Sequence, residues 1–167
     1  GKIERVEELW SMGIRLITIL WNYENCIGYP NSERSEIMRK GLKQFGFEVV
    51  EKMNERKMLV DVSHLSDGGF WDVVKTSKCP VVASHSNARE ICPHPRNLTD
   101  EMIRALAEKG GVIGINFYPR FIRKNKKANV EDIVTHIRHI VNIGGIESVC
   151  IGTDFDGFSG ESIEIER

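Results

Sequence analysis

The chain has 167 residues, 41% of them hydrophobic and 28% charged, with a formal net charge of -1 at pH 7. This composition is typical of a soluble globular protein and excludes a disordered or fibrous chain. The near-zero charge excludes an overall basic surface for nucleic acid.

A basic cluster, the lengths of the apolar runs and the spacing of the cysteines further restrict the kind of protein that is expected. The basic cluster within residues 120–127 is interpreted as a solvated loop. No apolar run approaches the ~20 residues of a membrane span, so no membrane segment is expected. The four cysteines have no paired spacing, which argues against a disulfide or structural-zinc framework. We therefore expect a cytoplasmic protein.

Five short apolar runs, rich in β-branched residues, predict buried strands at residues 14–21, 58–64, 80–85, 111–118 and 148–155. Segments with helical period separate or precede them, at residues 6–13, 36–57, 68–77, 99–110 and 129–145. Thr99 is a predicted N-cap, and Gly110 is a predicted helix stop.

This alternation predicts a single α/β domain over residues 1–167, with a parallel sheet covered by helices. Four of the runs end in Trp21, His64, His85 or Asp154. In an eight-stranded barrel such strand ends converge on one mouth, whereas an open sheet would spread them along a line. We favour a (β/α)8 barrel of the TIM type. The barrel would be incomplete here, since a full one needs ~250 residues and this chain has about five strands.

Two similar patterns, "LVDVSHLSD" and "VVASHSNAR", place His64 and His85 at strand ends. Two imidazoles that meet at a barrel mouth could bind one metal ion, and "GTDFDG" adds the carboxylates of Asp154 and Asp156 as ligands or general base. A hydrogen-bonded structural histidine is the alternative at each position, and Asp and Gly are also ordinary turn residues.

The remaining candidates are more ambiguous. His136 and His139 share a helix face, where a surface or supporting role is favoured over metal binding. His94, in the loop "ICPHPRN", is expected to be structural. Arg96 in the same loop could hold a substrate carboxylate through two N–H groups, although an ordinary salt bridge is the simpler interpretation.

The motifs "DVSHLSDGGFWDVV", "SHSNAR", "HPRNLTDEMI", "GGVIGINFYP" and "GTDFDG" occur in this order. Together they resemble the membrane dipeptidase (renal dipeptidase-like) family of zinc hydrolases, within the amidohydrolase superfamily. The resemblance implies a metallo-dipeptidase with two zinc ions that hydrolyses the peptide bond of dipeptides by metal-activated hydroxide. A homodimer is compatible with this prediction.

Individual roles follow from the same resemblance. His64 and His85 match two ligands of one zinc ion, and Arg96 matches the residue that binds the terminal carboxylate of the dipeptide. Asp154 matches the catalytic acid and base. Phe121 falls where the family has a backbone amide near that carboxylate.

The chain departs from the family pattern in two places. Trp21 stands where the family has a histidine that polarises the scissile carbonyl; an indole can donate a hydrogen bond or line a pocket but cannot act as acid or base. The family's His-x-Asp and bridging glutamate have no counterpart, and by spacing they would precede Gly1. The chain thus resembles the C-terminal two-thirds of a dipeptidase, and we expect activity only from the intact protein.

Two other functions stay open. An amidohydrolase-like barrel could act on another amide, a lactone or a phosphoester, because fold and metal do not fix the substrate. A non-catalytic barrel that has lost its metal site is the second alternative, consistent with Trp21 and the missing ligands.

Overall fold

The computed structural model describes residues 1–124 and 127–158, so Lys126 of the predicted basic loop lies outside the described residues. The chain divides into two compact units, Gly1–Val82 (unit 1) and Ala83–Arg167 (unit 2). The expectation of one domain over residues 1–167 stays a prediction.

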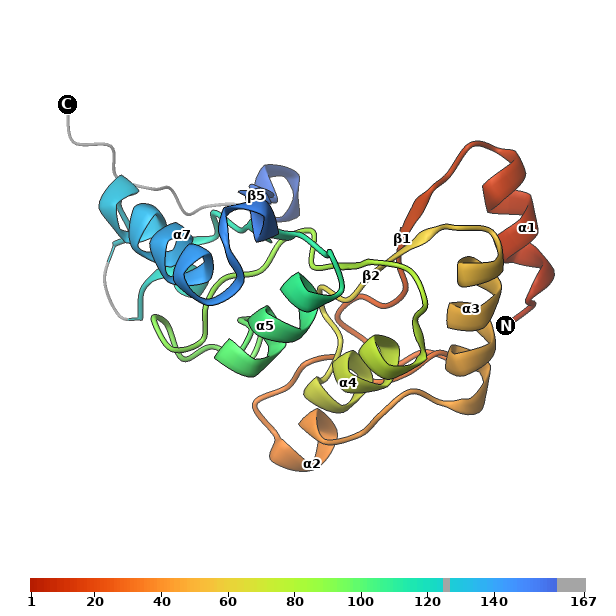
Figure 1. The fold of residues 1–167 in the computed structure, drawn as a ribbon. Coiled ribbons are helices and arrows are strands. Elements are labelled where there is room, and N and C mark those ends of the chain that lie inside the picture. The colour runs from red at the N-terminus through yellow and green to blue at the C-terminus, as the bar shows by residue number, and fades with distance from the viewer. Residues whose placement is uncertain (125–126, 159–167) are drawn as a thin grey trace. The chain divides into compact units, whose positions relative to one another are not determined.

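Unit 1 contains a parallel three-stranded sheet in the order β1-β2-β3. Figure 1 labels two of these strands, β1 and β2. Ile17 lies opposite Val60, and Val60 lies opposite Val81. The three strands are β1 (Leu16–Thr18), β2 (Leu59–Asp61) and β3 (Val81–Val82). All three predicted strand positions in this unit are confirmed, although each strand is shorter than its apolar run.

The helices of unit 1 are α1 (Glu4–Ser11), α2 (Ser35–Met38), α3 (Gln44–Glu55) and α4 (Asp67–Thr76). Helix α3 packs against α4 and has a buried face with the spacing of successive helical turns, formed by Gly46, Val49, Val50 and Met53. Ser66 is the N-cap of helix α4, and its Oγ accepts a hydrogen bond from the Gly69 N–H at 3.1 Å. Burial of these faces forms the core of unit 1.

The helical segment predicted over residues 36–57 is two helices rather than one. Between them, the Leu42 N–H donates to Asp72 Oδ2 at 2.8 Å, and the Lys43 N–H donates to the Ile27 carbonyl at 2.8 Å. A Cβ atom on Gly41 would collide with the Asp72 carboxylate. Partners distant in the sequence therefore take the backbone donors that a continuous helix would use.

The described residues of unit 2 contain two parallel strands, β4 (Ile113–Ile115) and β5 (Val149–Ile151), at the two remaining predicted positions. Its helices are α5 (Asp100–Glu108), α6 (Pro119–Ile122) and α7 (Val130–Gly144), and its 3-10 turns are Ile146–Ser148 and Phe155–Gly157. Helix α5 packs against α7. The short helix α6 was not predicted.

The helix boundaries of α5 follow the predicted signals. Thr99 Oγ1 accepts a hydrogen bond from the Met102 N–H at 3.3 Å. Gly110 has φ of +67°, and the Gly111 N–H donates to the Leu106 carbonyl at 2.8 Å. This pairing is that of a Schellman motif, in which glycine adopts the left-handed conformation at low cost. Both the N-cap and the stop are confirmed.

The N-terminus of α7 has a capping box that sequence reasoning missed. Asn129 Oδ1 accepts from the Asp132 N–H at 2.9 Å, and Asp132 Oδ2 accepts from the Asn129 N–H at 3.1 Å. Asp132 also pairs with Arg123, whose Nη1 lies 3.0 Å from Oδ1. Arg123 thus pairs with α7 while its side chain stays 38% exposed, which is consistent with the predicted solvation at this residue.

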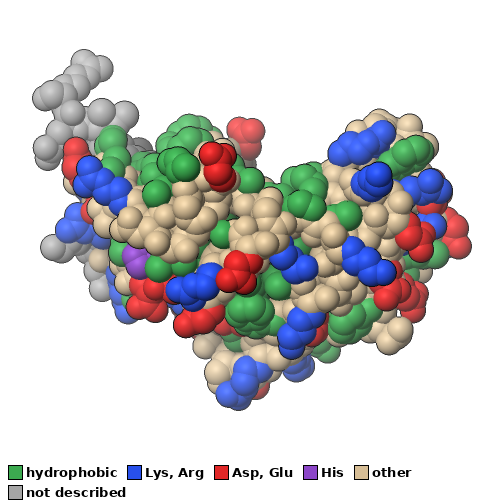
Figure 2. All heavy atoms as spheres, in the orientation of Figure 1, with side chains coloured by type: hydrophobic (Ala, Val, Ile, Leu, Met, Phe, Trp, Pro, Cys, Tyr) green, Lys and Arg blue, Asp and Glu red, His purple; other side chains and the backbone are tan. Residues whose placement is uncertain are grey.

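Charges on the surface are intermixed. On the face drawn in Figure 2, basic and acidic side chains are interspersed rather than gathered by sign. Exposed pairs such as Arg34 with Glu36 and Lys43 with Glu24 contribute to this pattern. In the part of the chain that the structure describes, no helix has the length and apolar character needed to cross a membrane.

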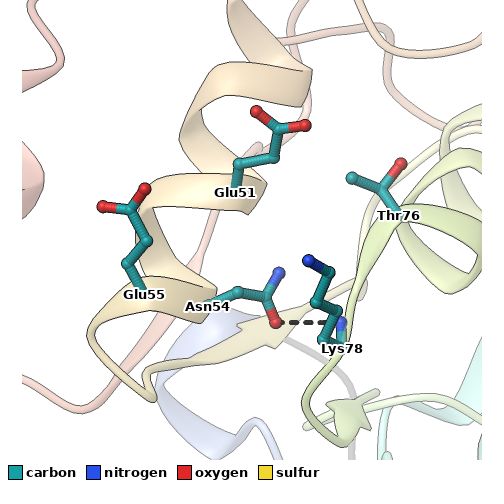
Figure 3. Close-up of a pocket in the computed structure, with 5 residues that line it drawn as sticks. All are labelled: Glu51, Asn54, Glu55, Thr76 and Lys78. Atoms are coloured by element: carbon teal, nitrogen blue, oxygen red, sulfur yellow. Dashed lines mark hydrogen bonds between the residues drawn. The ribbon is translucent and has the colours of Figure 1, made fainter.

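Asn54, at the end of α3, joins that helix to the segment that enters β3. Its Oδ1 accepts hydrogen bonds from Ser77 Oγ, the Lys78 N–H and the Cys79 N–H at 3.0 to 3.1 Å. Its Nδ2 donates to the Val50 carbonyl at 2.7 Å. Figure 3 shows the bond to Lys78. The Asn54 amide thus forms hydrogen bonds with several backbone and side-chain groups.

We expect Asn54→Ala to lower the free energy of unfolding by about 2 kcal/mol, because the Lys78 and Cys79 N–H groups lose their acceptor. Urea denaturation of the protein measures this change. Glu51→Ala is the matched control, since Glu51 is an exposed residue of the same helix and should change stability by less than about 0.5 kcal/mol. Equal losses in the two variants would contradict the role of Asn54.

Candidate active site

Polar residues follow the strands in both units. In unit 1, β2 leads into Ser63 and His64. In unit 2, Asn116 follows β4, and Asp154 comes three residues after β5. Because Ile115 pairs with Ile151, the segments that carry Asn116 and Asp154 leave the same edge of this sheet. The carboxyl ends of parallel strands are where α/β proteins place ligands and catalytic groups.

His64 lies in a turn with a left-handed backbone, φ +82°. The turn is held by Asn31, whose backbone N–H and Nδ2 donate to the His64 carbonyl at 2.8 and 3.1 Å. On the ring, Nδ1 donates to Asn22 Oδ1 at 3.0 Å. The neutral imidazole then has its lone pair on Nε2, which is the form that binds metals.

Asp61, in the same motif, has a structural role that sequence reasoning missed. Its side chain is buried and accepts hydrogen bonds from Thr18 Oγ1 at 2.6 Å and the Ser63 N–H at 3.0 Å. A buried carboxylate needs such donors. The charged residue inside an apolar strand was the signal that could have identified it. Asp61 joins β1 to the turn before His64.

Trp21 is 62% exposed and packs edge to face against Tyr23, with ring centroids 6.1 Å apart. Its predicted place in a substrate pocket stays a prediction.

His85 follows Ser84 in a segment that packs closely against the sheet of unit 2. Ser84 Oγ and His85 Nδ1 share a hydrogen bond of 2.7 Å. The Ser84 carbonyl approaches Gly114 of β4 and Gly152 after β5, where any added Cβ would collide with it. The absence of side chains at these glycines lets the backbone that carries His85 reach the end of the strands.

Arg96 is only 7% exposed, and its guanidinium lies over the ring of Phe121 at 5.4 Å. Arg96 Nη2 donates to the His85 carbonyl at 3.3 Å. Asn97 Nδ2 donates to the Phe121 carbonyl at 2.7 Å, which fixes this contact from the next residue. The structure therefore brings three predicted site residues, His85, Arg96 and Phe121, into one cluster.

His94 and Phe121 both contact Arg96, and a role was predicted for each. His94 Nδ1 accepts from the Arg96 N–H at 3.1 Å, consistent with its predicted structural role. The Phe121 N–H donates to the Tyr118 carbonyl at 2.9 Å within the start of α6. Phe121 thus reaches Arg96 through its ring, and the predicted contact of its amide with a substrate carboxylate stays a prediction.

Asp154 has a left-handed backbone, φ +60°, which is uncommon for a residue other than glycine. Its Oδ2 accepts a hydrogen bond from Asn116 Nδ2 at 3.0 Å. Asn116 is completely buried, whereas Asp154 is half-buried and so remains accessible. Asn116 was not predicted as a site residue; its place directly after an apolar strand was the available signal.

The two histidines of α7 serve the structure of unit 2. His136 is completely buried: its Nδ1 accepts from the Ala88 N–H at 3.1 Å, and its Nε2 donates to the Ile122 carbonyl at 2.9 Å. His139 Nε2 lies 2.7 Å from Asp100 Oδ1 on α5. The supporting role is thus the correct alternative for His136, which holds the loop after His85.

The predicted metal ligands belong to different units, His64 to unit 1 and His85 to unit 2. Their joint binding of one ion stays a prediction. Within residues 1–124 and 127–158, no group of three or more His, Cys, Asp or Glu side chains is arranged to hold a metal ion.

A surface pocket of about 410 Å³ in unit 1 is lined by none of the predicted site residues (Figure 3). It is lined by Glu51, Asn54, Glu55, Thr76 and Lys78. These residues end the helices that precede β2 and β3, so the pocket is at the amino ends of the strands. In α/β proteins that edge contributes to stability rather than to catalysis.

Comparison with known proteins places the chain in a family. Residues 1–166 match the family model described as membrane dipeptidase, peptidase family M19. The chain belongs to the membrane dipeptidase family. The resemblance of its five sequence motifs is therefore confirmed, and the fold and buried networks described above are those of a dipeptidase-family chain.

Curated relatives agree with this assignment. An uncharacterized protein from Klebsiella pneumoniae is 36% identical over 169 residues, which cover 95% of this chain and 61% of that protein. An uncharacterized dipeptidase from Schizosaccharomyces pombe is 37% identical over 155 residues, which cover 91% of this chain and 37% of that protein. The dipeptidase-family chain thus spans only part of the length of these relatives.

Solved structures share the α/β fold of parallel strands and helices. An amidohydrolase from Pseudomonas aeruginosa is 31% identical with a TM-score of 0.84, covering 95% of this chain and 48% of that one. A metallopeptidase from Rhodobacter sphaeroides, bound to a phosphinate mimic of the dipeptide L-Ala-D-Ala, is 30% identical with a TM-score of 0.82. That match covers 92% of this chain and 46% of the metallopeptidase.

Burial lowers the pKa of His136 below its ordinary value of 6.5, and the hydrogen bond to the Ile122 carbonyl only partly opposes this effect. Below pH 6.5 the unfolded chain binds a proton at His136 that the folded chain does not. The free energy of unfolding should therefore fall as the pH drops from 6.5 toward the lower pKa of the folded state.

Urea denaturation between about pH 5 and pH 7 measures this dependence. We expect His136→Gln to be less stable at neutral pH but to lose less stability on acidification. Thr135→Ala, an exposed change on the same helix, should keep the dependence of the parent protein. Identical pH dependences for the parent and His136→Gln would contradict the role assigned to burial.

Proposed function

We propose that the full-length protein is a metal-dependent hydrolase of dipeptides. Membership of the family supports this function, as do relatives from Schizosaccharomyces pombe and Claviceps purpurea that are named dipeptidases. The observation that carries the proposal is the half-buried Asp154 carboxylate, held after β5 by the Asn116 amide. A fixed, accessible carboxylate at a strand end is suited to proton transfer.

We infer a (β/α)8 barrel for the full-length protein, to which the described residues of this chain contribute five strands. The parallel pairing of every strand in both sheets and the helices between successive strands support this inference. Location in the cytoplasm and a homodimer are further proposals, which rest on the sequence.

We propose that His64 and His85 would hold zinc, with the remaining ligands supplied by other parts of the full-length protein. Their chemistry fits this role in one respect: a side-chain oxygen binds Nδ1 of each ring, at Asn22 and at Ser84. Such contacts orient metal-binding imidazoles. When bound, zinc would polarise the scissile carbonyl and lower the pKa of water to ~7.

Asp154 is assigned to proton transfer. In hydrolysis, a water oxygen bonds to the carbonyl carbon, the C–N bond breaks, and a water proton is transferred to the leaving nitrogen. The Asp154 carboxylate accepts this proton from water and then donates it to the amine, so the residue ends in the state in which it began.

Arg96 is assigned to the terminal carboxylate of the dipeptide. Its guanidinium is held against the Phe121 ring and the His85 carbonyl, which limits the side-chain entropy lost on binding. Two parallel N–H groups can then bind both oxygens of a carboxylate. Trp21 would line the pocket but cannot transfer a proton.

The first test is hydrolysis of a dipeptide panel, L-Ala-D-Ala included, by the full-length protein with zinc. We expect turnover that a chelator abolishes, and in Asp154→Asn a fall in kcat of about 100-fold or more at unchanged zinc content. Brisk cleavage of lactones or other amides without dipeptide turnover would favour the broader amidohydrolase function. Absence of both zinc and turnover would favour a non-catalytic protein.

The second test compares dipeptides with their C-terminal amides. In Arg96→Gln, we expect KM for dipeptides to rise about 10- to 100-fold, because a charge-assisted contact is lost. KM for the amides should change little. Arg104→Gln, at an exposed position on α5, is the control and should leave both unchanged. Equal effects of Arg96→Gln on both substrates would exclude recognition of the carboxylate.

A further inference from the structure

A network of buried amides leads from the loop after β3 to the Asp154 carboxylate. Asn87 and Asn116 are both completely buried. The Asn116 N–H donates to Asn87 Oδ1 at 3.0 Å, and Asn87 Nδ2 donates to the Asn116 carbonyl at 2.9 Å. This reciprocal pair fixes the backbone of Asn116 at the end of β4.

The Asn116 side chain is also fixed in orientation. Its Oδ1 accepts a hydrogen bond from the Tyr118 N–H at 2.6 Å, so Nδ2 must face the opposite way. Nδ2 donates to Asp154 Oδ2 at 3.0 Å. Rotation of the amide by half a turn would break both bonds and place two acceptors against each other.

Asp154 is constrained from its own side as well. The Gly157 N–H donates to the Asp154 carbonyl at 2.9 Å, which closes a turn around the left-handed residue. A Cβ atom on Gly157 would lie 2.7 Å from Asp154 Cγ, so the carboxylate needs the space that glycine leaves. A sparsely populated backbone conformation of this kind persists only where its surroundings hold it.

We propose that Asn116 is a positioning residue. Asn87 anchors Asn116, and the Asn116 amide holds the Asp154 carboxylate in one orientation. From that orientation the carboxylate exchanges a proton with water and the leaving amine. This inference rests on the proposed dipeptidase function. The backbone of Asn116 is already held by Asn87, so the bond from Nδ2 to Asp154 is the contact whose loss should affect catalysis more than folding.

The test is steady-state kinetics of Asn116→Leu in the full-length protein, since leucine is close to asparagine in shape and lacks the donor. We expect kcat for dipeptides to fall about 10- to 100-fold because the proton-transferring group is less well oriented. KM and zinc content should be unchanged. In an Asp154→Asn background, Asn116→Leu should cause no further loss, because the group that it positions is already absent.

A second variant covers the case in which Asn116→Leu does not fold. Asn116→Ala removes the donor to Asp154 without adding bulk or a second acidic group beside it, so the same fall in kcat is expected. Asn54→Ala is the stability control: it weakens a network of similar size in unit 1 and should leave kcat unchanged.

Three outcomes would overturn the inference while the parent protein is active on dipeptides. These are an unchanged kcat in the Asn116 variants, a rise in KM that accounts for the whole loss, and additive losses in the double variant. An inactive parent protein would instead overturn the proposed function, and this inference with it.

Discussion

The parallel pairing of β4 with β5 is the constraint on which the candidate active site depends. The register sets Ile115 beside Ile151, and as a consequence Asn116 and Asp154 leave the sheet at the same edge. A shift of one residue would turn Asn116 to the opposite face, because side chains alternate along a strand. The same pairing sets Gly114 opposite Cys150, and the Ser84 carbonyl packs against both Gly114 and the nearby Gly152.

Side-chain amides determine much of the local geometry in both units. Asn54 in unit 1, and Asn87 and Asn116 in unit 2, each use both the oxygen and the nitrogen of the side chain in hydrogen bonds. A buried amide that loses a partner costs about 1–3 kcal/mol, so the network of the buried Asn87 and Asn116 is fixed in one arrangement. Among the described residues, Asn97 Oδ1 is the one buried side-chain polar atom without a partner. It belongs to the residue that follows Arg96 in the sequence.

Sequence patterns predicted the strands well and the side-chain contacts poorly. All five strand positions and both ends of α5 followed from apolar runs and capping residues. The segment 36–57 was wrongly treated as one helix, because the competing acceptor on Asp72 is distant in the sequence. His136 has the spacing of the buried residues Ile133 and Ile140 on α7, which could have shown that it faces the core.

The sequence alone determined the α/β class, the order of strands and helices and the ends of α5, because each of these depends on neighbours within a few positions. It also determined membership of the dipeptidase family, because the family is identified by the order of its motifs. Only the tertiary structure decided that Asn116 contacts Asp154, 38 positions away, and that His136 holds Ala88, 48 positions away. Local periodicity describes which face of an element is buried. Periodicity carries no information about which distant side chain contacts that face, since this contact depends on how helices and strands pack together.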